Sequence, residues 1–202
     1  MKYHCLAALV VFGGATLAQA QLEIAGSASG LFDGVSTSYG GLTYSDSTFD
    51  VFPAFGFFAF GGNPGPPNFN NLGSFMLSPT AFDYSNPPTT FTLDVDFTTP
   101  TGIVTGQTTD YMASLTGHVI DSTTGGVFID FGSTPQTFVF DTSSGHGMFT
   151  LAINPLAIYP GQNASLTGFG SAAFTSVPAP AAVACMSLGL IGALRRRRPR
   201  KG

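Results

Sequence analysis

The chain has 202 residues, of which 44% are hydrophobic and only 9% charged, and its formal net charge at pH 7 is −4. This net value hides a segregation: all seven Lys and Arg residues lie outside residues 21–176, whereas all eleven Asp and Glu residues lie within them. A segment without cations cannot neutralise phosphates, so no nucleic-acid partner is expected. It also has no lysine for Schiff-base chemistry and no arginine to clamp a carboxylate or phosphate.

Cysteine usage narrows the chemistry further. Cys5 and Cys185 both fall outside residues 21–176. That segment therefore has no disulfide, no thiol nucleophile and no cysteine-based zinc site. Its stability has to come from an apolar core, and its length is sufficient for one domain with a sizeable core.

Residues 1–20 have the three parts of a secretory signal peptide. A short positive start is followed by a mostly apolar stretch at 6–17, and Ala18 and Ala20 are small residues at the positions that signal peptidase inspects. We expect signal peptidase to cut between Ala20 and Gln21. A buried helix or a membrane span is the alternative, but the apolar run is short for about 30 Å of hydrocarbon.

The first half of the following segment contains strand candidates that are separated by glycine and proline. These candidates are residues 22–32, 41–45, 47–52, 55–60 and 73–78. Residues 61–71, GGNPGPPNFNN, contain three prolines and three glycines and cannot join a ladder. We expect a long loop there, which either connects the sheets or borders a ligand groove.

The second half alternates more clearly between apolar and polar residues. In FTLDVDF, one face would carry Phe91, Leu93, Val95 and Phe97, and the other Thr92, Asp94 and Asp96. Residues 126–131, 137–141 and 148–153 repeat this pattern, with Phe128 and Asp130 facing outward. Turn-forming residues occupy 121–126, 132–135, 141–147 and 154–163. This spacing predicts an all-β fold, an antiparallel β-sandwich of jelly-roll or Greek-key type.

The C-terminal residues have the composition of a membrane-retained tail. Residues 181–194 carry no charge and would span roughly 21 Å as a helix, which is marginal for a bilayer. They are followed by a membrane-retention cluster, Arg195, Arg196, Arg197 and Arg198. Basic residues beside an apolar segment stay on the cytoplasmic side, so the body of an exported chain would lie outside the inner membrane.

The order of features in this tail carries a resemblance. Val177, Pro178, Ala179 and Pro180, then an apolar helix and a terminal arginine cluster, resemble a PEP-CTERM sorting signal, with Ala179 where glutamate is usual. The resemblance implies an exosortase-type transpeptidase that acts near the motif, transient insertion in the inner membrane, and delivery to the cell surface or extracellular matrix. A permanent tail anchor is the alternative. The domains expected are a signal peptide at 1–20, an extracellular β-domain at 21–176 and a sorting tail at 177–202.

The body also resembles, more loosely, the small β-domains of choice-of-anchor type. The resemblance rests on GSASGLFDGV at 26–35 together with residues 70–102. It implies a structural or adhesive role outside the cell, where matrix polysaccharide would be a partner.

Three kinds of site chemistry remain to be weighed. Asp94 and Asp96 on one strand face could help to hold Ca²⁺, although solvated carboxylates are the simpler interpretation. Two carboxylates could also hydrolyse a glycoside, but the chain has no tryptophan to stack on sugars. We interpret His118 and His146 as turn histidines rather than as members of a Ser-His-Asp site with Ser144 and Asp141.

We therefore expect a non-enzymatic surface or matrix protein with no catalytic residues, no metal site and no required cofactor. The first alternative is a polysaccharide-binding module assisted by Ca²⁺, and the second is a secreted glycoside hydrolase.

Overall fold

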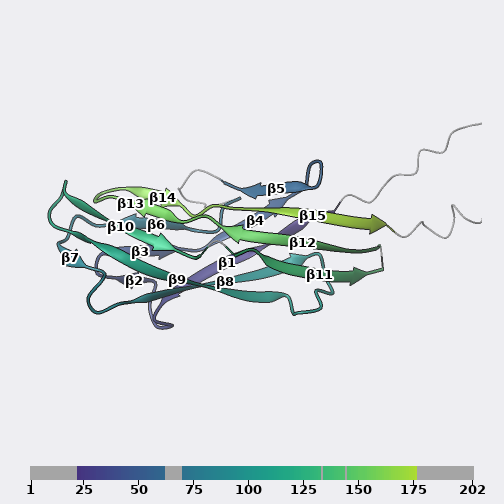
Figure 1. Cartoon of the computed structure of the whole chain (residues 1–202), viewed down its shortest axis with the longest axis horizontal. Helices are drawn as coiled ribbons and strands as arrows, with labels where there is room; N and C mark the ends of the chain where they lie inside the picture. Colours follow the sequence, from purple (N-terminus) through teal and green to yellow (C-terminus); the bar gives the residue numbers. More distant parts are fainter. Residues whose placement is uncertain (1–21, 62–69, 133, 144, 177–202) are drawn as a thin grey trace, which may run out of the picture.

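The computed structural model describes residues 22–61, 70–132, 134–143 and 145–176. Throughout these ranges the chain is all-β and contains no helix, and the paired strands run antiparallel (Figure 1). The all-β antiparallel prediction is therefore confirmed. The signal and sorting helices expected at the two ends lie outside the described residues.

The largest sheet has seven strands. Its order is β13 (Leu156–Ile158), β10 (Gly125–Asp130), β9 (Thr108–Val119), β8 (Thr90–Thr99), β1 (Ile24–Phe32) and β4 (Ser47–Val51), and β7 (Phe82–Asp83) also pairs with β9. The strand β1 lies between β4 and β8, which are distant in sequence, so this sheet depends on long-range pairing.

Two four-stranded sheets complete the structure. One has the order β11 (Gln136–Thr142), β12 (Gly145–Ile153), β15 (Gly168–Ser176) and β5 (Phe57–Phe60). The other has the order β14 (Asn163–Ser165), β6 (Ser74–Leu77), β3 (Leu42–Ser45) and β2 (Ser38–Tyr39). Buried residues from all three sheets form one continuous apolar cluster, so the sheets share a single core.

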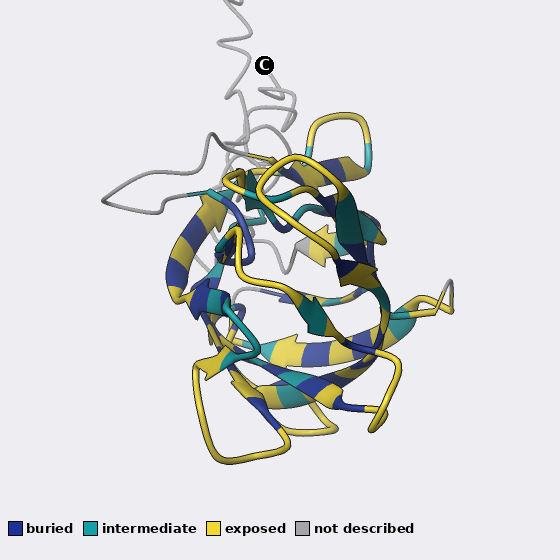
Figure 2. Cartoon of the chain, turned by 90° about the vertical axis from the view of Figure 1, so that its left-hand side faces the viewer, coloured by how far each residue is buried: buried dark blue, intermediate teal, exposed yellow. Residues whose placement is uncertain are grey.

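The side-chain alternation predicted for the second half is confirmed. Phe91, Leu93, Val95 and Phe97 on β8 are at most 1% exposed. Phe128 and Asp130 face outward from β10, whereas its Val127 and Ile129 are buried. Figure 2 shows this pattern as alternating buried and exposed bands along the strands.

The core is built from aromatic rings that pack against glycines. A Cβ atom added at Gly26 would lie 2.8 Å from the Phe49 ring, and one added at Gly147 would lie 2.8 Å from the Phe140 ring. At both positions the ring occupies the space that a side chain would need. Part of the glycine content therefore serves a packing scheme of large against small residues.

Buried polar groups connect the layers. The Tyr111 hydroxyl on β9 donates a hydrogen bond to the Leu151 carbonyl on β12 at 3.2 Å, which joins the seven-stranded sheet to a four-stranded one. The Tyr44 hydroxyl donates to the Leu72 carbonyl at 2.8 Å, and burial holds the pKa of Tyr44 far above its usual value. These tyrosines stay neutral and keep their bonds over the whole physiological pH range.

Several turn predictions are wrong. Residues 154–163 contain β13, whose Leu156 and Ile158 pair with β10. The predicted turn at 141–147 is much shorter, because Asp141 pairs with His146 and Thr142 with Gly145. Both turns were predicted from glycine and polar content. In the structure, residues of the first segment pair with β10, and residues of the second pair β11 with β12, so pairing outweighs local composition.

Two long strands, β9 and β15, were not predicted. The inward positions of β15 include Gly168 and Gly170, which have no hydrophobic side chain to reveal the alternation. A Cβ atom at Gly170 would lie 2.5 Å from the Phe58 ring, so the missing apolar group is supplied by another strand. A hydrophobic pattern read from one segment cannot show such a position.

Candidate functional site

The residues assigned to sorting lie outside the described ranges. These are Ala18, Ala20 and Gln21 at the predicted cleavage site, Val177, Pro178, Ala179 and Pro180 in the motif, and Arg195, Arg196, Arg197 and Arg198 in the retention cluster. Among the residues that the structure does describe, no helix is long and apolar enough to cross a membrane.

Asp94 and Asp96 lie on the outer face of β8, as the alternation predicts. Asp94 is paired across the ladder with Asp110 of β9, and Asp96 accepts a hydrogen bond from the Thr108 hydroxyl at 3.2 Å. The Oδ1 atom of Asp94 is buried and has no hydrogen-bond partner. Desolvation, and then the charges of Asp110 and Asp96, raise the pKa of the Asp94 carboxyl above its ordinary value.

The same outer face carries more than half of the acidic residues of the chain. Six of the eleven project from the seven-stranded sheet on this side: Asp50, Asp83, Asp94, Asp96, Asp110 and Asp130. Since residues 21–176 contain no Lys or Arg, no lysine or arginine of this segment offsets them. We call this surface the acidic face.

Within the described ranges, no three Asp, Glu, His or Cys side chains are grouped as a metal site would require. Calcium binding by Asp94 and Asp96 therefore stays a sequence-based hypothesis.

The histidine interpretation is wrong in its local structure. His118 lies in β9, opposite Gly126 of β10, and His146 lies in β12, opposite Asp141 of β11. Both side chains are exposed. Ser144 lies outside the described residues, so the Ser-His-Asp arrangement is not tested.

A shallow depression lies at one end of the acidic face, over β9, β10 and β13. Its volume is about 270 Å³, and it is lined by Thr116, Gly117, Gly126, Val127, Phe128, Ala157, Ile158 and Tyr159. Two aromatic side chains stand at this depression, since Phe128 is 43% exposed and Tyr159 is 56% exposed. We call it the aromatic groove.

The floor of the aromatic groove includes bare backbone at Gly126. Gly126 follows the outward register of Phe128, so its missing side chain would have pointed into the groove. A Cβ atom there would lie 3.2 Å from the Tyr159 ring and 2.9 Å from the Ile158 carbonyl oxygen. The Tyr159 ring thus packs against the bare backbone of Gly126.

Polar and acidic groups surround the aromatic groove. Thr116 is paired with Phe128, and His118 is paired with Gly126 and, on its other side, with Asp83 of β7. Asp130 follows Phe128 by two residues on the same face of β10. Asp121, in the turn after β9, accepts hydrogen bonds from the backbone amides of Thr123 and Thr124, which contribute to a lowered pKa of its carboxyl.

The sequence contains part of the signal for this groove. The outward position of Phe128 was predicted, but Tyr159 was assigned to a turn and no tryptophan was available to suggest a sugar platform. The missing information is the pairing of β10 with β13, which places Tyr159 next to Gly126.

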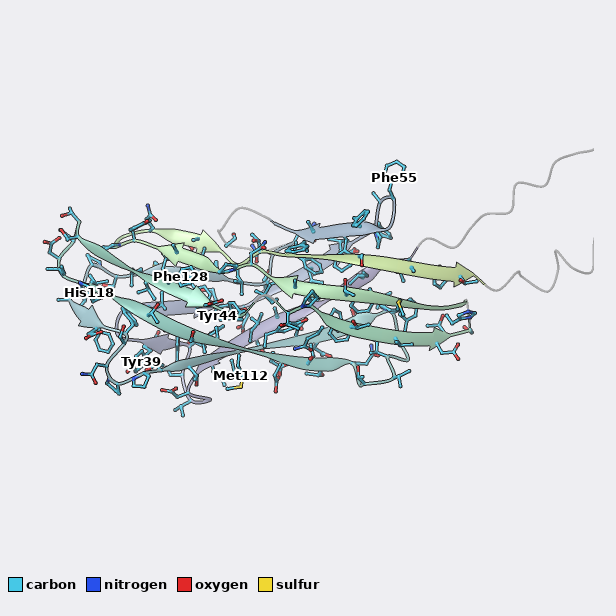
Figure 3. The ribbon with its side chains drawn as sticks, viewed as in Figure 1. Tyr39, Tyr44, Phe55, Met112, His118 and Phe128 are labelled. Atoms are coloured by element: carbon cyan, nitrogen blue, oxygen red, sulfur yellow. The ribbon has the colours of Figure 1, made fainter. Side chains whose placement is uncertain are left out.

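A second exposed aromatic group lies on the other sheet. Phe55 is fully exposed at the tip of a tight turn, where Phe55 and Gly56 have positive φ values of 54° and 81°. Phe57 on β5 and Phe169 on β15 face outward nearby and are 69% and 53% exposed. Figure 3 shows Phe55 projecting from the turn before β5, far from Phe128 and His118.

Comparisons of the chain with protein-family models, with curated proteins and with solved structures found no match.

Proposed function

We propose that this chain is an exported, non-enzymatic protein of the cell surface or extracellular matrix, delivered by a PEP-CTERM-like tail. The observation that carries the proposal is the segregation of charge. Every Lys and Arg lies in the predicted signal or tail, and every Asp and Glu lies in between. Such a distribution suits a chain whose two termini are recognised by the export machinery and whose central segment acts outside the cell.

The placement of the strands supports this proposal. The strand β1 begins at Ile24, shortly after the predicted cleavage site at Gln21, and β15 ends at Ser176, directly before Val177. The strands that the structure describes therefore fall between the two predicted processing sites in the sequence. Signal peptidase and an exosortase-type transpeptidase could cut there without removing a strand.

We further propose that the three sheets form a β-sandwich of Greek-key or jelly-roll type. The support is that β1 pairs with β4 and β8, and β15 with β12 and β5, so neighbours in the sheets are often distant in sequence. Such connections are typical of these sandwiches and rare in simple meanders.

Mass spectrometry of both termini tests the sorting proposal. The protein is recovered from the envelope and the medium of the producing bacterium, with a matched variant in which the arginines at 195–198 are all replaced by glutamine. We expect the wild-type chain to begin at Gln21 and to end within residues 177–180, and the variant to be processed poorly at its C-terminus. A wild-type chain in the envelope that still ends at Gly202 would instead establish a permanent anchor and overturn the sorting proposal.

A further inference from the structure

We infer that the aromatic groove binds a linear polysaccharide that carries free amines, and that the acidic face guides this polymer to it. The inference rests on the proposed function, since an exported matrix protein would meet polysaccharide outside the cell. It names a partner chemistry that the sorting proposal leaves open.

The walls and floor of the aromatic groove suit a sugar ring. The Tyr159 ring packs against Gly126, and Phe128 stands on the next outward position of β10. The apolar C–H face of a pyranose packs on such rings, while hydroxyl groups such as that of Thr116 and the imidazole of His118 can exchange hydrogen bonds with sugar hydroxyls. A volume of about 270 Å³ suits a small polar ring better than a large ligand.

Charge selects the kind of polysaccharide. Six carboxylates project from the acidic face, and no lysine or arginine of residues 21–176 compensates them. An anionic polymer such as a polyuronate or a nucleic acid would be repelled. A polymer with ammonium groups gains attraction from these carboxylates and also from the faces of Phe128 and Tyr159, because aromatic rings attract cations.

One extended chain of sugars could contact the aromatic groove and the acidic face at the same time. Asp130 lies on the outward face of β10 two residues after Phe128, opposite Ser114 of β9. Further along β9, Asp110 faces outward opposite Asp94. From Thr116 to Asp110 is roughly 20 Å along the strand, so an extended oligosaccharide seated in the groove would pass over several carboxylates.

The experiment measures binding of the full chain to three oligosaccharides of similar length. These are a glucosamine oligomer with free amines, its fully N-acetylated counterpart and an oligogalacturonate. The first two share one ring and, in a mildly acidic buffer that protonates the amines, differ in charge. We expect the free-amine oligomer to bind at least about tenfold more tightly than the acetylated one, and the oligogalacturonate not to bind. Equal affinity for the first two would overturn the selection for amines, and binding of none would overturn the groove itself.

Variants separate the groove from general attraction between opposite charges. Phe128→Ala should weaken binding of the free-amine oligomer about tenfold, as truncation of an aromatic anchor does. Phe169→Ala is the matched control, since Phe169 is a comparably exposed phenylalanine on the outer face of β15. Asp130→Asn should weaken binding, whereas Asp141→Asn on β11 should not. If Phe128→Ala binds like the wild type, the attraction is unspecific and the inference is wrong.

These outcomes are independent of processing at the termini. A chain that keeps Gly202 in the cell but binds the free-amine oligomer through Phe128 would contradict the sorting proposal alone. A chain that is processed as expected but ignores the oligomer would contradict the groove alone.

Discussion

The seven-stranded sheet and the sheet formed by β11, β12, β15 and β5 have outer faces of different chemistry. The seven-stranded sheet presents six carboxylates and the aromatic groove. The sheet formed by β11, β12, β15 and β5 presents Phe57, Phe169, Met148 and Val139, and its strands carry one carboxylate, Asp141. A chain without lysine or arginine in this segment cannot pair its carboxylates by ion pairs with those residues. Six of the eleven lie on one solvated surface, which therefore has a negative electrostatic potential.

On the inner faces of these two sheets, by contrast, aromatic rings pack against glycines in the same way. Replacing such a glycine by alanine tests this similarity, and we expect it to have the largest effect. Gly30→Ala on β1 would bring a Cβ atom to 2.2 Å from the Phe91 ring. Gly170→Ala on β15 would bring one to 2.5 Å from the Phe58 ring and to 1.8 Å from the Thr150 carbonyl oxygen. Because buried rings cannot move aside without opening the core, each change should lower the free energy of unfolding by about 1–3 kcal/mol. Thermal denaturation measures this loss as a fall of several degrees in Tm.

The control for these two variants is Gly61→Ala, where the nearest atom to an added Cβ is 4.0 Å away. It should unfold close to the wild-type temperature. A loss at Gly30 without one at Gly170 would show that the two sheets do not share the packing of rings against glycines.

A smaller effect is expected at the strained turn on the apolar side. Phe55 has a φ of 54° and is fully exposed, so it bears the cost of a left-handed conformation without gaining burial. Asparagine followed by glycine is the preferred pair for such a two-residue turn. Phe55→Asn should therefore raise the free energy of unfolding by about 1 kcal/mol. Urea denaturation measures it, and Phe57→Asn in the adjoining strand should bring no gain.

The smallest effect concerns charge on the acidic face. Because the pKa of Asp94 is raised in the folded chain, its ionised form costs stability above that pKa, and this cost disappears as the pH falls through it towards the ordinary value of 3.8. Asp94→Asn should therefore raise the free energy of unfolding at neutral pH by less than about 1 kcal/mol, since the site is largely solvated. Thermal denaturation would show this gain as a slightly higher Tm. The gain should vanish in acid.

Asp141→Asn provides the comparison for this charge effect, because Asp141 lies opposite His146 rather than opposite another carboxylate. A gain at Asp94 that persists at low pH would mean that repulsion among Asp94, Asp110 and Asp96 is not its cause.

The sequence was sufficient for β8 and β10, whose own residues alternate between apolar and polar. The inward row of Phe91, Leu93, Val95 and Phe97 and the outward position of Phe128 could be predicted, because each apolar residue is buried by its own strand. The strand β15 could not, since its inward glycines receive the Phe58 ring from another part of the chain.

The groove was missed for a related reason. Tyr159 follows a three-residue strand, β13, that is defined by its pairing with β10 rather than by its composition. Even a correct list of exposed aromatic residues would not have placed Tyr159 beside Gly126. Contacts between distant segments, rather than residue types, carry the missing information.

The aromatic groove lies far from the end of β15 at which the C-terminal tail begins. The strand β15 ends at Ser176 at one end of the long axis, whereas β7, β10 and β13 lie towards the other end (Figure 1). The twelve residues of β9 alone extend roughly 40 Å along this axis. If the chain is held through its tail, the body acts as a spacer. It would carry the polymer a few nanometres clear of the bilayer, beyond the Debye length at physiological salt, so that the surface charge of the lipids would hardly affect capture.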